Sequence, residues 1–223
     1  AGCTRDACSK AGEESLMRRD SRETCSVMAE AERLTRAIAA FRAANAEDPN
    51  TIDDGGVQRP RELVDAERLA AWVKRLEPQA SESLTLASYC QHLRRWQSPR
   101  ESYEPGRIGY LKWRKDLQRF HADASARILR DAGYGDDTIA AVSEINLKQS
   151  PRTNPDVQTM EDALCLSFLE HEFGEFSAKH DDAKVIDIVQ KTWRKMSDKA
   201  HAIALTLALE GRPLELVQQA LSG

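Results

Sequence analysis

The chain has 223 residues, of which 30% are charged and 41% hydrophobic, and its formal net charge is -4. This length suffices for one domain with a substantial core, and the small net charge gives no overall attraction to nucleic acid or an anionic membrane. No apolar run reaches the roughly 18 residues that a membrane-spanning helix needs. Five irregularly spaced cysteines do not form a disulfide framework. We therefore expect an intracellular protein of the cytoplasm or of a reducing organelle lumen, without a membrane partner.

Residues 1–27 mix charged residues, serine and cysteine without a sustained apolar period, which predicts a disordered or non-native leader. Residues 28–223 are expected to form a single helical domain, because apolar residues recur there at helical spacing. The expected helices carry these apolar residues on one face: Leu34, Ile38 and Phe41; Leu63, Leu69 and Val73; Leu84, Ala87 and Cys90; Leu117, Phe120 and Ile128; Ile139, Val142 and Ile145; Ala163 to Leu169; Val185, Val189 and Leu207; and a short final helix from Pro213. No segment alternates like a β-strand, so the sequence predicts an all-α bundle of seven or eight helices.

Two histidines lie on separate expected helices. His92 falls in the third, SLTLASYCQHLRRW, beside Tyr89 and Trp96 at helical spacing. An imidazole there can be a ligand or an acid–base group, or a half-buried side chain satisfied by a neighbouring carboxylate. His121 lies on the core-facing side of the long helix, where an imidazole needs either a hydrogen bond or a metal.

A pair of acidic residues, Glu161-Asp162, lies on an otherwise apolar helix. Asp162 has helical spacing to Cys165 and Leu169, so it is expected to face the core. A buried carboxylate is costly unless a cation or several hydrogen-bond donors compensate for it. Asp162 therefore indicates either a functional site or a buried salt bridge to an arginine.

Arginine stands next to tryptophan three times, as Arg95-Trp96, Trp113-Arg114 and Trp193-Arg194. Arginine binds phosphate or carboxylate through two hydrogen bonds, and a nearby ring can stack on a base. The alternative is a solvated charged face. The candidates to hold a small anionic substrate are Arg95, Arg100, Arg107, Arg114 and Arg194.

The chain resembles a family known as domain of unknown function 4202 in the stretches AIAAFRAANAEDPNT, QHLRRWQSPR, GRIGYLKWRKDLQRFHADASARIL, TMEDALCLSFLEHEF and KTWRKMSDKAH. These stretches span most of the chain. The family name implies no activity.

A second resemblance is to the HD superfamily of metal-dependent phosphohydrolases, and it implies an HD-domain-like bundle. LASYCQHLRRW, HADASARILRDAGY and MEDALCLSF take the places of its motifs, with Gln91-His92 where that superfamily has His-Asp and Lys148 where it has a histidine. The resemblance implies one divalent ion (Mn, Fe, Zn or Mg) held by His92, His121 and Asp162.

With that site we expect hydrolysis of a small phosphorylated or nucleotide-like substrate, with Glu161 as a general base or a group behind the ligands and Lys148 as a fixed positive charge in place of a lost ion. The alternative is a non-catalytic helical module that binds a nucleotide, RNA or a protein partner through its Arg/Trp-rich pocket. Nucleic acid is a possible partner but not the favoured one.

Overall fold

The computed structural model describes residues 6–149 and 153–222, with side chains from residue 26 onward within those ranges. Its elements in chain order are α1 (Asp6–Ala46), β1 (Thr51–Asp53), β2 (Gln58–Pro60), α2 (Arg61–Leu76), α3 (Glu82–Cys90), η1 (Arg95–Gln97), η2 (Arg100–Ser102), α4 (Gly106–Asp131), α5 (Asp136–Asn146), α6 (Pro155–Ser167), η3 (Phe168–Glu172), α7 (Phe173–Lys179), α8 (Asp182–Trp193), α9 (Asp198–Ala204) and α10 (Gly211–Ser222). The all-α class is confirmed. The ten α-helices of the described residues exceed the seven or eight expected.

Two expected helices are broken in the structure. The third ends at Cys90, so His92 lies in the turn between α3 and η1 and not on a helix. The expected penultimate helix is divided into α8 and α9, because the Ser197 hydroxyl accepts a hydrogen bond from Ala200 N at 3.3 Å and begins a new helix. Between α1 and α2 the chain forms the small antiparallel hairpin of β1 and β2.

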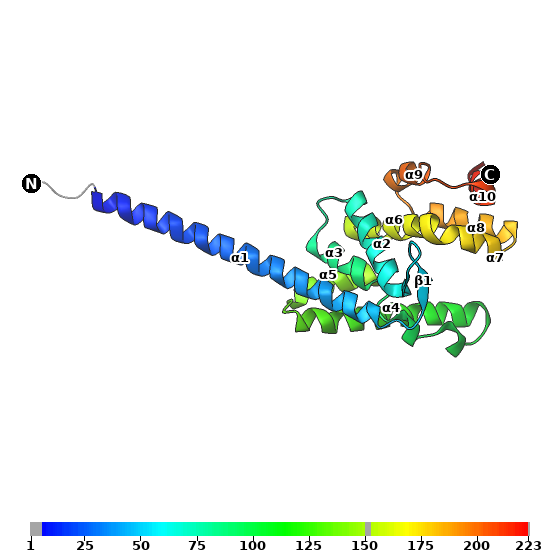
Figure 1. Cartoon of the computed structure of the whole chain (residues 1–223), viewed down its shortest axis with the longest axis horizontal. Helices are drawn as coiled ribbons and strands as arrows, with labels where there is room; N and C mark the ends of the chain where they lie inside the picture. Colours follow the sequence, from blue (N-terminus) through cyan, green and yellow to red (C-terminus); the bar gives the residue numbers. More distant parts are fainter. Residues whose placement is uncertain (1–5, 150–152, 223) are drawn as a thin grey trace, which may run out of the picture.

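The first helix is longer than the apolar pattern predicts. It begins at Asp6, within the segment 1–27 that was expected to lack regular structure, and residues 1–5 lie outside the described range. Residues 6–27 contain no proline and one glycine, so helix propensity does not oppose a helix although the apolar period is missing. In Figure 1, α1 extends away from the body of the molecule as a long rod.

The core lies where the end of α1 meets α2, α3, α5 and α6. α2 packs on α3 and on α6, and α5 packs on α3 and α4. Large side chains from separate elements are fully buried there, including Phe41, Leu84, Leu166 and Phe173. Burial of each such side chain stabilises the folded state by roughly 1.5–3 kcal/mol. These contacts therefore fix the ends of α2, α3 and α6 that surround the candidate site.

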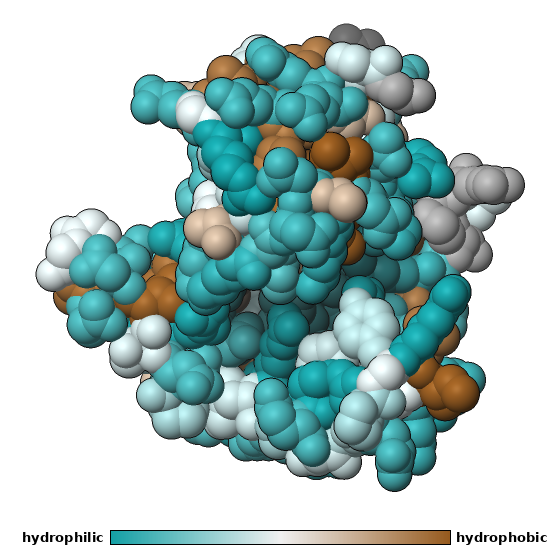
Figure 2. Space-filling view, turned by 90° about the vertical axis from the view of Figure 1, so that its right-hand side faces the viewer, coloured by the Kyte–Doolittle hydropathy of each residue, from teal (hydrophilic) through white to brown (hydrophobic). Residues whose placement is uncertain are grey.

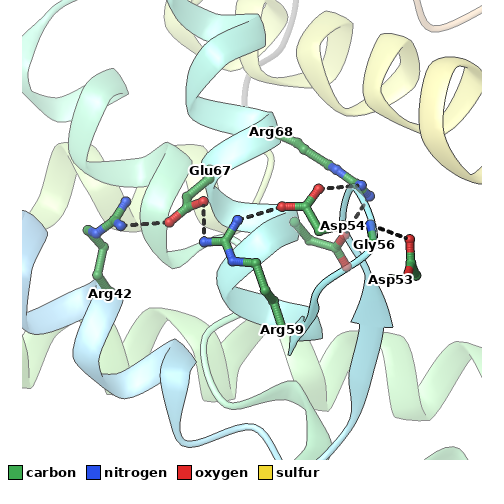
Figure 3. A network of polar contacts seen from close by, with 8 residues as sticks. Arg42, Asp53, Asp54, Gly56, Arg59, Glu67 and Arg68 are labelled. Carbon is green, nitrogen blue, oxygen red and sulfur yellow. Dashed lines mark hydrogen bonds and ion pairs between the residues drawn. The ribbon is translucent and has the colours of Figure 1, made fainter.

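A network of ion pairs holds the hairpin against α2 and α1 (Figure 3). The Arg59 guanidinium lies 2.5 Å from Asp54 and 2.8 Å from Glu67. Glu67 also pairs with Arg42 of α1 at 2.7 Å, and Arg68 pairs with Asp54 at 3.2 Å. A network of charges that share partners stabilises the folded state more than isolated surface ion pairs do. This network therefore fixes the start of α2.

None of the helices in the described residues is both long enough and apolar enough to cross a membrane. The face shown in Figure 2 is hollowed between its upper and lower halves, and mostly hydrophilic residues surround the hollow.

Candidate functional site

Two adjoining cavities open between the helices, with volumes of about 570 and 380 Å³. They share a wall made of His92, Arg95, Trp113, Leu164 and Glu172. We call the larger one the acidic cavity, after Glu62, Asp65 and Glu172 in its lining, and the smaller one the basic cavity, after Arg95, Arg114, Lys148 and Lys195. Both volumes fall in the range of about 300–1,000 Å³ that small-molecule sites occupy.

The two histidines meet at the basic cavity, with ring centroids 6.2 Å apart. His121 is 4% exposed, and its Nδ1 lies 2.9 Å from the Leu93 carbonyl oxygen. Burial lowers the pKa of His121 to about 4, against the opposing effect of the Leu93 hydrogen bond. The ring is therefore neutral, and because a carbonyl only accepts, Nδ1 carries the hydrogen. Nε2 is left as a buried lone pair without a partner in the described residues.

His92 lies at the wall that both cavities share. Burial lowers its pKa well below the usual value, and the positive charges of Arg95, Lys148 and Arg114 lower it further. The cations that disfavour a protonated His92 also make the electrostatic potential at this site positive. An anion placed beside His92 would be stabilised by the same charges.

Lys148 and Glu161 form an ion pair at the edge of the basic cavity, with 2.5 Å between Nζ and Oε2. Lys195 lies 3.6 Å from the other carboxylate oxygen. Burial acts to raise the pKa of Glu161, but the charge and hydrogen bond of Lys148, together with Lys195, outweigh it and hold that pKa below its usual value. Glu161 is therefore ionised and unsuited to take up a proton near neutral pH.

The backbone at Lys148 is unusual. Its φ is 54°, and Arg94 is the other non-glycine residue in the described part of the chain with positive φ. Lys148 directly follows the last turn of α5, a position that glycine usually takes. A lysine in this conformation costs roughly 1–2 kcal/mol, and such outliers concentrate at functional sites.

A buried amide network lies beside the histidines. Gln91 Nε2 donates to Asn146 Oδ1 at 3.0 Å, and Asn146 Nδ2 donates to Ser125 Oγ at 3.2 Å. All three side chains are at most 5% exposed. Gln91, which stands where the HD superfamily has a metal-binding histidine, therefore ties the turn after α3 to α4 and α5.

Asp162 is buried as expected, at 4% exposure, but it lines neither cavity. Its carboxylate accepts hydrogen bonds from Ser197 N at 2.8 Å, Ser197 Oγ at 2.5 Å and Gln158 Nε2 at 3.0 Å. These neutral donors compensate its charge, so Asp162 anchors the start of α9, and it forms no salt bridge to an arginine in the described part of the chain.

The residues present do not fit the metal centre that the HD resemblance implies. His92 and His121 approach each other, whereas Asp162 is directed to Ser197. Within residues 26–149 and 153–222, no group of three His, Cys, Asp or Glu side chains is positioned to hold a metal ion. The arrangement instead offers neutral imidazoles surrounded by cations.

The five arginines expected to hold an anion divide into three groups. Arg95 and Arg114 line the basic cavity, and the Arg95 guanidinium lies 5.5 Å from the centre of the Trp113 ring. Arg100 lines the acidic cavity, but it donates to the backbone carbonyls of residues 103, 104 and 106 at 2.9–3.3 Å and so shapes that loop. Arg107 and Arg194 line neither cavity.

Six further charged residues line the cavities and were not among the expected site residues: Lys195 in the basic cavity, Arg61, Glu62, Asp65 and Glu101 in the acidic one, and Glu172 in both. Glu62 is 6% exposed, and its Oε2 has no partner in the described residues. Burial raises its pKa to about 8, and burial also raises the pKa values of Asp65 and Glu172. The available signal was that Glu62 lies four residues before Ala66 and seven before Leu69, on the apolar face of α2.

Residues 35–217 match the family described as Domain of unknown function (DUF4202). No curated protein and no solved structure matches the chain.

Proposed function

The chain belongs to the DUF4202 family, whose description names no activity, and from the geometry of its joined cavities we propose that it binds a small phosphorylated or nucleotide-like compound. The observation that carries this proposal is the gathering of Arg95, Arg114, Lys148 and Lys195 around the basic cavity. Phosphate suits these groups because it accepts several charge-assisted hydrogen bonds at once.

The charges of the basic cavity are not balanced by its own carboxylates. Glu161 pairs with two lysines, and the pKa of Glu172 is raised. Arg95 forms no ion pair within the described residues, and Arg114 has a single neutral partner, the Tyr110 hydroxyl at 3.3 Å. A bound anion would complete this set of donors.

Hydrolysis of the bound compound is the second candidate, and the lone pair on His121 Nε2 favours it. A neutral imidazole can accept a hydrogen bond from the water that attacks phosphorus and so orient it, while the surrounding cations stabilise the charge on the phosphoryl oxygens. No step of this hypothesis uses a metal, because Asp162 is held by Ser197.

We also retain two expectations about the setting. Cys90 and Cys165 are free, buried thiols, as expected in a reducing intracellular compartment. Nucleic acid is not the favoured partner, because these cations gather around one cavity and a duplex would need them along an extended surface.

The test is calorimetric titration of the purified protein with inorganic phosphate, simple alkyl phosphates and nucleoside monophosphates, at low and high salt. Loss of a charged hydrogen-bond donor should weaken binding about tenfold or more, so Arg95→Gln and Lys195→Gln are the informative variants. Lys191→Gln is the matched control, because Lys191 pairs with Asp187 and lines neither cavity.

Absence of phosphate binding, or equal affinity in Arg95→Gln and the wild type, would contradict the proposal. Release of inorganic phosphate from bound esters separates the two candidates. Hydrolysis that is lost in His121→Asn with binding retained would establish the second one.

A further inference from the structure

The acidic and basic cavities share His92, Arg95 and Trp113 in their lining. A single ligand of moderate size can therefore reach both. Phosphate binding accounts for the basic cavity alone. The lining of the acidic cavity contains four acidic side chains, Glu62, Asp65, Glu101 and Glu172, together with Arg61, Arg95 and Arg100. Acidic side chains outnumber the cations there, so a hydrogen-bond donor suits this cavity better than a second phosphate.

Glu62 is the strongest indication of that group. Its side chain is 6% exposed and lines the acidic cavity, and Oε2 has no hydrogen-bond partner in the described residues. A buried carboxyl without a partner costs several kcal/mol. A cationic donor in the cavity would remove this cost, since it supplies both the hydrogen bond and the opposite charge.

The neighbouring charges leave room for such a donor. Asp65 follows Glu62 by about one turn of α2, and its nearest ion-pair contact is Arg68 at 3.9 Å. Glu172 reaches the same cavity from η3. Arg61 and Arg95 attract all three carboxylates, but neither forms an ion pair or side-chain hydrogen bond with any of them in the described part of the chain. A metal ion does not fit, because no three side chains there are positioned to hold one.

Building on the proposed function, we infer that the ligand is a phosphorylated compound that also carries a protonated amine, with its phosphate among the cations of the basic cavity and its ammonium group at Glu62. The indole rings of Trp96 and Trp113 line the same space. They can cover the apolar part of the ligand and attract the ammonium group by a cation–π interaction.

The protonation of Glu62 gives this inference a second readout. The groups whose charges act on Glu62 are Asp48, Arg61, Asp65 and Arg95, and burial raises its pKa to about 8. Without ligand Glu62 is therefore mostly protonated at neutral pH. An ammonium group beside it favours the ionised form, so binding should release a proton near neutral pH.

The experiment uses the whole chain and aminoalkyl phosphates of increasing length, each paired with the alkyl phosphate that lacks the amine. We expect at least one amino compound to bind about tenfold or more tightly than its partner and to release a proton, detected by calorimetry in buffers of different ionisation enthalpy. Glu62→Gln should remove that preference and leave alkyl phosphate binding within about twofold of wild type. Asp65→Asn is the second variant, and Glu32→Gln on the exposed side of α1 is the control.

The outcomes separate the two proposals. If neither member of any pair binds, both proposals fail. If the members of every pair bind equally well, phosphate binding stands and the amine is excluded. A preference that survives in both Glu62→Gln and Asp65→Asn would also overturn the assignment of the ammonium group to the acidic cavity.

Discussion

His121 donates its Nδ1 hydrogen to the Leu93 carbonyl at 2.9 Å and so connects the buried side of α4 to the turn that carries His92. The acceptor is a backbone atom, which no side-chain substitution removes. This bond fixes the tautomer of His121 and the position of the turn together. It also leaves Nε2 as the ring nitrogen without a hydrogen-bond partner in the described residues.

The first prediction concerns acid stability. The pKa of folded His121, about 4, lies below the ordinary 6.5, so protons bind more readily to the unfolded chain between these values. The contribution of His121 to the free energy of unfolding is complete above about pH 6.5 and is lost as the pH falls through 4. His121→Asn should flatten this decline in urea unfolding between about pH 7 and pH 4.5. His180→Asn, a histidine that lines neither cavity, should leave the slope unchanged.

The second prediction has the opposite sign and concerns Glu62. Its folded pKa of about 8 lies above the ordinary 4.5, so the folded state holds a proton that the unfolded state releases. The free energy of unfolding should therefore fall as the pH rises from 4.5 through 8. Glu62→Gln should gain a few kcal/mol over wild type near pH 8, since each pKa unit corresponds to about 1.4 kcal/mol. A gain that is equal near pH 5 and pH 8 would show that ionisation is not its cause.

The third prediction separates the two adjacent acidic residues. Asp162→Asn replaces an acceptor of three hydrogen bonds with a partly donating amide, so it should cost roughly 1–3 kcal/mol of stability and leave phosphate affinity unchanged. Glu161→Gln frees Lys148 and Lys195 from their carboxylate, so it should strengthen phosphate binding. Urea unfolding and calorimetry on both variants provide the comparison. Loss of phosphate affinity in Asp162→Asn, with the fold intact, would refute its structural role.

The fourth prediction uses the backbone at Lys148. Lys148→Gly and Lys148→Ala both remove the charge, and both should weaken phosphate binding about tenfold or more. Of the two replacements, only glycine adopts the positive φ of 54° without steric strain. Lys148→Gly should therefore be more stable than Lys148→Ala by about 1 kcal/mol. Equal melting temperatures for the two variants would contradict the proposed backbone cost.

Apolar spacing allowed the helical class and the burial of His121 and Asp162 to be predicted, because an apolar stripe on a helix must face the core. It could not show which partner each buried polar group meets. Asp162 meets Ser197 because α8 ends at Trp193 and a new helix begins at Asp198, and the apolar residues on either side of that break continue one pattern.

The position of His92 illustrates a second limit. A continuous helix through SLTLASYCQHLRRW satisfies the apolar pattern, but Arg94 takes a left-handed conformation and the chain turns after Cys90. No glycine marks that turn in the sequence. The acidic cavity was not predicted for a related reason. Its lining comes from α2, η1, η3 and other segments, and no single segment contains all of its charged residues.

The helical turn η3 has a consequence for insertions and deletions. Its hydrogen bond from Phe173 N to Phe168 O spans five residues, whereas an α-helix spans four. Loss of one residue between Phe168 and Glu172 could therefore be absorbed as an ordinary α-helix, without breaking the rod formed by α6 and α7. Such a deletion would remove the bulge from which Glu172 reaches the acidic cavity and would so change one wall of that cavity.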